Sequence, residues 1–185
     1  MTTADVQVQE IHIPTDHHAT LAATLLIPTV DVKAAVMIAP ATGIKRQFYQ
    51  NFAQYLAEQG FGVITFDNEG IGGSLDGSLK QSNASLISWG RYDMPAVLNQ
   101  LIKAFPNTSY HLVGHSAGGQ LFGLMPNHHK LTSVFNVACS SGRIRNMAMP
   151  YRAKAMYFMD VFIPLSNLAF GFTKTSRIGM GEDLP

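Results

Sequence analysis

The residues best suited to chemistry form one motif, Gly114-His115-Ser116-Ala117-Gly118. An apolar run, Tyr110 to Val113, precedes it and is typical of a buried strand, and the stretch from about Ala117 to Met125 indicates a helix. A serine on such a sharp strand-to-helix turn is held exposed at the end of the strand, as a nucleophile must be. The turn leaves no room for side chains two residues before or after the serine, so both motif glycines are expected to be required. The motif therefore predicts Ser116 as a nucleophile, with an incidental serine in a glycine-rich turn as the alternative.

A serine hydroxyl attacks carbonyl carbons poorly unless donors stabilise the developing oxyanion and a base removes the proton. One donor is expected to be the backbone N–H of Ala117, because the first residue of a helix has an unsatisfied N–H. The other is expected in Pro40-Ala41-Thr42-Gly43, which follows the apolar run Ala34 to Ala39. We assign it to the N–H of Thr42, and an ordinary turn is the alternative.

Apolar runs alternate with helical stretches along most of the chain. A polar–apolar alternation at 6–13 and a weaker one at 20–27 predict a hairpin of two strands. Further strands are expected at 34–39, 61–66, 110–113 and 133–138, with helices at about 47–59, 85–105 and 117–125. Unbroken apolar strands separated by helices indicate an α/β protein, a mostly parallel sheet covered on both faces with an antiparallel pair leading in. From Arg143 onward the sequence is rich in Met, Phe and Tyr and reads as helix only.

These features resemble the α/β-hydrolase superfamily, and within it the lid-bearing serine esterase and monoacylglycerol-lipase-like branch. Thr42 and Tyr49 fall at the spacing of that branch's His-Gly-x-Gly loop and its following aromatic residue, although Pro40-Ala41 replaces His-Gly. The stretch Asp67 to Ser74 matches the family's Asp-x-Arg-Gly-x-Gly-x-Ser except at Glu69. The resemblance implies a doubly wound hydrolase core at 1–142, with about six strands, and a helical lid or cap segment at 143–185.

The resemblance also implies that a catalytic acid and a histidine follow the lid, on the seventh and eighth family strands. The sequence stops before these two strands, so we expect it to be an N-terminal portion. Asp67 is not expected to be the acid, because the acid follows the serine in this fold. None of the seven histidines is well placed as a substitute base. Two functions stay open: ester or thioester hydrolysis through Ser116, or a truncated, catalytically silent module that binds rather than turns over.

Composition excludes several other classes. A length of 185 residues with 46% hydrophobic and 14% charged residues predicts a single domain with a sizeable core. Because 13 basic residues balance 12 acidic ones, a nucleic-acid partner is not expected. The single Cys139 excludes an internal disulfide, the histidine pairs lack a third metal ligand, and Leu75 interrupts a dinucleotide glycine motif, so no metal and no cofactor are expected. The first residues show no secretory signal, which favours the cytoplasm.

One apolar stretch, 155–172, is about as long as a membrane span, which argues against a wholly soluble protein. Asp160 and Pro164 argue against a span, which leaves a buried or lid-like helix pair as the favoured reading and contact with a membrane surface as the alternative. The apolar side chains of the expected lid segment suit the acyl chain of a small apolar ester or thioester substrate, or else they only pack the core. The residues concerned are Met147, Met149, Met156, Phe158, Phe162 and Phe170.

The strand expected at 133–138 has consequences for assembly. The resemblance places it beside the missing seventh strand, which leaves its backbone N–H and C=O groups unpaired at the edge of the sheet. Such an edge can template pairing with another chain. We therefore expect a homodimer, joined through this edge or through residues 143–172.

Overall fold

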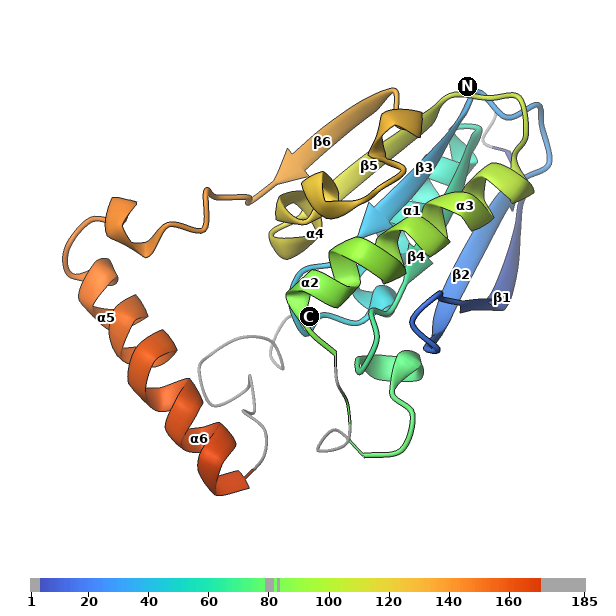
Figure 1. Ribbon diagram of the computed structural model, residues 1–185. Helices are drawn as coiled ribbons and strands as arrows, with labels where there is room; N and C mark the ends of the chain where they lie inside the picture. The colour runs from blue at the N-terminus through green and yellow to red at the C-terminus, as the bar shows by residue number, and fades with distance from the viewer. Residues whose placement is uncertain (1–3, 79–81, 83, 171–185) are drawn as a thin grey trace.

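The computed structural model describes residues 4–78, 82 and 84–170. Its strands lie close to the expected positions (Figure 1): β1 (Val6–Pro14), β2 (Thr20–Pro28), β3 (Ala34–Ala39), β4 (Phe61–Phe66), β5 (Tyr110–His115) and β6 (Ser133–Val137). The apolar alternation of β1 and the continuous burial of β3 follow from their positions, since β1 lies at the edge of the sheet and β3 in its centre.

The six strands form one sheet in the order β1-β2-β4-β3-β5-β6. β1 pairs antiparallel with β2, and β2 pairs antiparallel with β4. The pairs β3–β4, β3–β5 and β5–β6 are parallel. The expected α/β class, with a mostly parallel sheet and an antiparallel hairpin leading in, is confirmed. In this arrangement the strand ends that carry Thr42 and Ser116 belong to neighbouring strands, because Ala39 pairs with Gly114.

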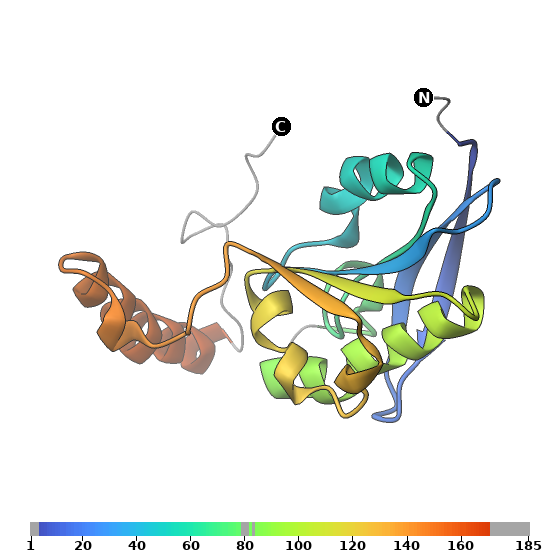
Figure 2. The same ribbon diagram turned by 90° about the horizontal axis from the view of Figure 1, so that it is seen from above.

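Helices cover both faces of the sheet (Figure 2). On one face lie a 3₁₀ turn, η1 (Arg46–Tyr49), and α1 (Gln50–Glu58), where the helix at 47–59 was expected. On the other face lies a continuous helical run of α2 (Leu86–Ser88), the π turn η4 (Trp89–Asp93) and α3 (Met94–Ala104). Ser85 begins this run with a capping box, in which its side chain accepts from the N–H of Ser88.

The helix expected at 117–125 is wrong in length. The structure has a single turn of helix, α4 (Ala117–Gln120), followed by the 3₁₀ turns η5 (Phe122–Leu124) and η6 (His128–Lys130). Glycine has a low helix propensity, and this stretch holds three glycines before Pro126. The elbow therefore rests on a short helix rather than a long one.

The segment after β6 runs away from the sheet (Figures 1 and 2). It contains η7 (Ile144–Asn146), α5 (Tyr151–Tyr157), the π turn η8 (Phe158–Phe162) and α6 (Ile163–Phe170). None of the residues in these four elements is buried, so the alternative that their apolar side chains pack the core is wrong. The rest of the expected lid segment, 171–185, lies outside the described residues.

Within the described ranges, no helix is both long and apolar enough to cross a membrane.

Candidate active site

The turn between β5 and α4 holds Ser116 in a conformation that few residues adopt. Its backbone has φ +49° and ψ −113°, in the region that L-residues other than glycine avoid. Ser116 is half-buried, and its N–H donates to the carbonyl of Val137 at 2.9 Å. The end of β6 therefore holds the backbone of the strained residue. A strained serine on a strand-to-helix turn is the backbone geometry of a nucleophile elbow.

The motif glycines are required by contact distances, as the sequence indicated. A Cβ added at Gly118 would stand 2.2 Å from the carbonyl oxygen of Ala39, and one at Gly114 would stand 2.4 Å from the Cα of Gly119. Real Cβ atoms essentially never approach so closely. Because Gly118 packs directly on Ala39, the elbow is in contact with the strand end that leads to the Thr42 turn.

Cys139, which follows β6, contacts the turn that carries Ser116, and the sequence alone did not predict this contact. Its thiol donates to the carbonyl oxygen of Ser116 at 3.2 Å, and a Cβ at Gly119 would meet its sulfur at 2.4 Å. No sequence motif marks this contact, because β6 and the residue that follows it reach the elbow only through strand pairing. The thiol fills the notch that Gly119 leaves open.

The two expected oxyanion donors lie at the same edge of the sheet. Ala117 is the first residue of α4, so its N–H has no acceptor within the helix. Thr42 is exposed and occupies the second position of a four-residue turn closed by the N–H of Ile44, which donates to the carbonyl of Ala41 at 3.1 Å. Gly43 has φ +75°, which the third position of a type II turn requires. This turn does not use the Thr42 N–H, which can therefore serve a ligand.

Tyr49 joins the two sides of this site. Its hydroxyl oxygen accepts the N–H of Ala41 at 2.9 Å and lies 2.9 Å from Nδ1 of His115. The pKa of Tyr49 is raised above its ordinary value because burial raises it more than the hydrogen bond from Ala41 lowers it. The sequence marks Tyr49 only by the spacing that it shares with the family, because its contacts depend on the pairing of β3 with β5.

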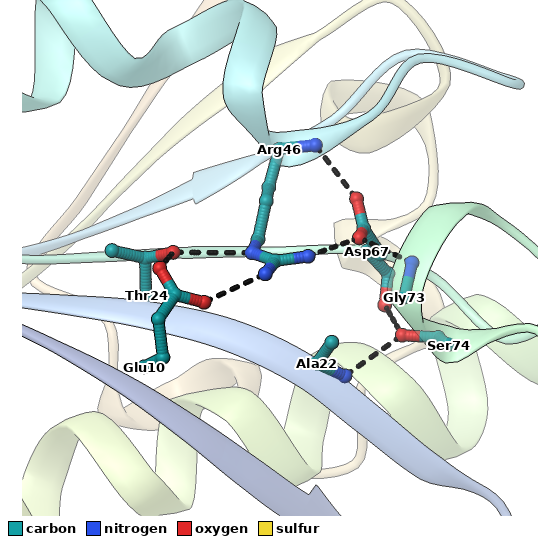
Figure 3. Close-up of polar contacts among 7 residues, drawn as sticks. All are labelled: Glu10, Ala22, Thr24, Arg46, Asp67, Gly73 and Ser74. Atoms are coloured by element: carbon teal, nitrogen blue, oxygen red, sulfur yellow. Dashed lines mark hydrogen bonds and ion pairs between the residues drawn. The ribbon is translucent and has the colours of Figure 1, made fainter.

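The loop after β4 is a structural clamp (Figure 3). Asp67 is fully buried and accepts from the backbone N–H of Arg46 at 2.7 Å, from the N–H of Gly73 at 2.9 Å, and from the Arg46 guanidinium. The same guanidinium reaches Glu10 and Thr24 on the hairpin at 2.6 and 3.1 Å. A buried carboxylate paired in this way fixes the start of η1, just after the Thr42 turn, to the sheet.

The glycines of the same loop serve the clamp too. Gly72 has φ +50°, and a Cβ there would stand 2.6 Å from Oδ2 of Asp67. Ser74, which ends the turn η2 (Gly72–Ser74), donates to the carbonyl of Asp67 at 2.7 Å and accepts the N–H of Ala22 at 2.9 Å. These contacts leave Asp67 as a scaffold residue, in accord with the expectation that it is not the catalytic acid.

Several histidines contact residues other than Ser116. His111 lies against the hydroxyls of Ser133 and Ser109, at 2.8 and 3.0 Å, and His128 contacts the carbonyl of Met125 at 2.7 Å. His17 stacks on Tyr92 in the hairpin region, with ring centroids 4.7 Å apart. Among the described residues, no imidazole or carboxylate is hydrogen-bonded to the Ser116 hydroxyl. Glu182 and Asp183, which follow the serine in sequence, lie outside the described residues.

A buried acid lies behind the clamp loop. Asp93, at the end of η4, is fully buried and accepts the N–H of Glu69 at 2.8 Å through Oδ2, while its Oδ1 has no partner. Burial raises the pKa of Asp93 to about 7, the hydrogen bond from Glu69 lowers it, and the charge of Glu69 raises it. Asp93 therefore titrates near neutral pH.

A polar cavity of about 400 Å³ lies beside the clamp loop. His12, His17, His18, Glu69 and Asp76 are among its lining residues, and Ser116, Thr42 and Ala117 are not. No group of three or more His, Cys, Asp or Glu side chains in the described part of the chain is arranged to hold a metal ion.

Comparison with known proteins agrees with this geometry. The sequence pattern of the family described as "Serine aminopeptidase, S33" matches residues 30–177. The fold is similar to that of a highly thermostable carboxyl esterase from Bacillus coagulans, with a TM-score of 0.65, 18% identity, and coverage of 92% of this chain and 54% of the esterase. A hypothetical protein from Pseudomonas aeruginosa gives a TM-score of 0.64 at 18% identity, covering 93% of this chain and 57% of that one.

A lipase in its open form gives a TM-score of 0.61 at 22% identity, covering 81% of this chain and 51% of the lipase. The chain thus spans a little over half the length of each of these three structures. No curated protein matches its sequence. The family pattern extends over most of the chain and includes the turn that carries Ser116. The chain therefore belongs to the serine aminopeptidase S33 family of the α/β-hydrolase superfamily.

Proposed function

We propose that this chain carries the nucleophile and the oxyanion hole of a serine hydrolase that cleaves esters or thioesters of small apolar acyl groups. The observation that carries the proposal is the strained Ser116, at φ +49° between β5 and α4, next to the N–H of Ala117. Ser116 would attack the acyl carbon, and the N–H groups of Thr42 and Ala117 would bind the oxyanion that forms. The exposed apolar side chains of 143–170 support an apolar acyl group.

The experiment that tests this function is labelling of Ser116 with an organophosphonate, followed by intact-mass analysis of the parent chain and Ser116→Ala. We expect slow labelling of the parent, because the described residues hold no base on the Ser116 hydroxyl. The oxyanion hole and binding alone retain about 10³–10⁴-fold rate enhancement over water in serine enzymes that have lost their triad. Labelling that persists at full strength in Ser116→Ala would contradict the assignment of the nucleophile.

The second candidate is a module that binds an acyl ligand without turning it over. The observation that favours it is the set of other partners held by His111, His115 and His128. Hydrolysis of a chromogenic short-chain ester by the purified chain separates the two functions. Rapid turnover that is lost in Ser116→Ala supports the hydrolase and refutes the argument from the missing base. Binding of the ester without labelling or turnover supports the module.

A further inference from the structure

Tyr49 is buried at the junction of η1 and α1, with 7% of its surface exposed. Its ring packs in the hydrophobic cluster that α1 forms on the sheet, together with Val36, Ile38 and Ala53. Burial of the ring leaves the hydroxyl few directions, and the two polar atoms it meets are the Ala41 N–H and His115 Nδ1, each at 2.9 Å. The phenol oxygen is therefore held between two segments that lie far apart in sequence.

The identity of these two segments gives the contact its significance. Ala41 directly precedes Thr42, the expected oxyanion donor, and His115 directly precedes Ser116. The Tyr49 hydroxyl oxygen thus contacts the residue before Thr42 and the residue before Ser116. In the proposed reaction Thr42 and Ser116 act on the same substrate carbonyl. Phe48 also stacks on the His115 ring, with the two ring centroids 6.3 Å apart.

The backbone alone does not hold Ala41 in this position. β3 ends at Ala39, so the N–H of Ala41 lies beyond the strand pairing, and Ala41 has only 7% of its surface exposed. A buried N–H is costly to leave without an acceptor. Loss of the phenol oxygen would leave this N–H unpaired and favour movement of the turn that follows. The direction of the Thr42 N–H depends on that turn.

We propose that Tyr49 is a positioning residue, whose hydroxyl accepts from Ala41 and donates to His115 and so fixes the Thr42 N–H relative to Ser116. The proposal rests on the proposed function, since it assigns Tyr49 to the same reaction. It also requires a definite tautomer. A phenol that donates to Nδ1 leaves the proton of the neutral His115 ring on Nε2.

The test compares Tyr49→Phe with Tyr55→Phe, a matched control on α1 whose side chain is 57% exposed. The rate of Ser116 labelling by the organophosphonate should fall about tenfold in Tyr49→Phe, less than the 10²–10³-fold typical of losing an oxyanion donor itself. Tyr55→Phe should label at the parent rate. Equal labelling rates in Tyr49→Phe and the parent would overturn the positioning role while the proposed function stands.

Amide and imidazole NMR give a second measurement that does not need reactivity. The parent should show a slowly exchanging Ala41 amide and an unprotonated Nδ1 on His115, and Tyr49→Phe should shift the Thr42 amide and change the His115 tautomer. An Ala41 amide that exchanges in the parent as fast as an exposed loop amide would overturn the proposal, even if Tyr49→Phe does not fold. If the parent is never labelled, the proposed function fails, and the NMR result alone decides whether Tyr49 joins the two turns.

Discussion

Thr42 and Ala117 would act through their backbone N–H groups, so their side chains matter little to the proposed chemistry. Pro40-Ala41, in place of the His-Gly that the resemblance implies, would therefore leave the proposed donor in place. Thr42 occupies the second position of the turn at Ala41–Ile44, which the sequence alone did not show. This position tolerates proline. A substitution can therefore remove the N–H of Thr42 and keep the turn.

Thr42→Pro should lower the rate of Ser116 labelling by about 10²–10³-fold, the cost of losing one oxyanion donor. Thr42→Ala, which keeps the N–H, should stay close to the parent rate. The second-order rate constants for phosphonylation measure both effects. Equal losses in the two variants would show that the side chain matters and that the backbone assignment is wrong.

Asp93 makes stability depend on pH in a direction that can be worked out. In the folded protein its carboxyl keeps its proton up to about pH 7, whereas in the unfolded chain it loses the proton near pH 3.9. Between these values the folded state binds more protons, so the free energy of unfolding contributed by this group falls as pH rises. Above about pH 7, the Asp93 carboxyl is ionised in both states, and its contribution to the free energy of unfolding falls no further.

Asp93→Asn should therefore become more stable relative to the parent as pH rises from about 4 to 7, and the gain should reach a plateau of the order of 4 kcal/mol above that range. Urea denaturation at a series of pH values measures this difference. Asp31→Asn, at an exposed position, controls for the general loss of one negative charge. A difference between Asp93→Asn and the parent that does not vary with pH would contradict the buried titration.

At the scale of elements, the site depends on how closely β3 and α4 approach. The carbonyl of Ala39 occupies the space that a side chain at residue 118 would need, and strand pairing sets Ala39 beside Gly114. The shortness of α4 follows from the same glycines that permit the approach. The glycines of the elbow thus allow α4 to pack closely on β3 and also make α4 short.

Gly118→Ala should destabilise the chain by about 1–3 kcal/mol or more, because the added Cβ would collide with backbone atoms that cannot move aside cheaply. Gly123→Ala is the matched control, since nothing lies within 4 Å of a Cβ added there. Urea midpoints of the two variants measure the difference. A Gly118→Ala variant as stable as Gly123→Ala would mean that the approach of α4 to β3 is looser than described.

At the scale of the whole molecule, apolar surface lies open along β6 and the segment after it. β6 is an edge strand of the described sheet, and its Phe135 and Val137 are 66% and 41% exposed. Leu168 on α6 is 86% exposed, and no residue of α5, η8 or α6 is buried. We propose that copies of the chain associate through the β6 edge, where unpaired N–H and C=O groups can template a continued sheet.

Light scattering at tens of micromolar should show a dimer, and Phe135→Lys should shift it toward monomer, because charged residues blunt strand edges. Val8→Lys places the same charge on β1, the opposite edge strand, where 54% of Val8 is exposed. It should leave the dimer intact. A monodisperse monomer of the parent chain would sink the proposal, and dissociation by Val8→Lys alone would transfer it to the other edge.

Local sequence determined the strands, the hairpin and the elbow, because runs of apolar residues and single glycines report the needs of their own backbone. Ser116 and its glycines could be recognised in this way, and so could the α/β class. The tertiary structure alone decided the contacts of Tyr49, Cys139 and Asp93, whose partners lie 8 to 66 residues away in sequence. Strand pairing and packing bring these partners together, and no local pattern of residues encodes which distant atoms a buried hydroxyl, thiol or carboxyl will meet.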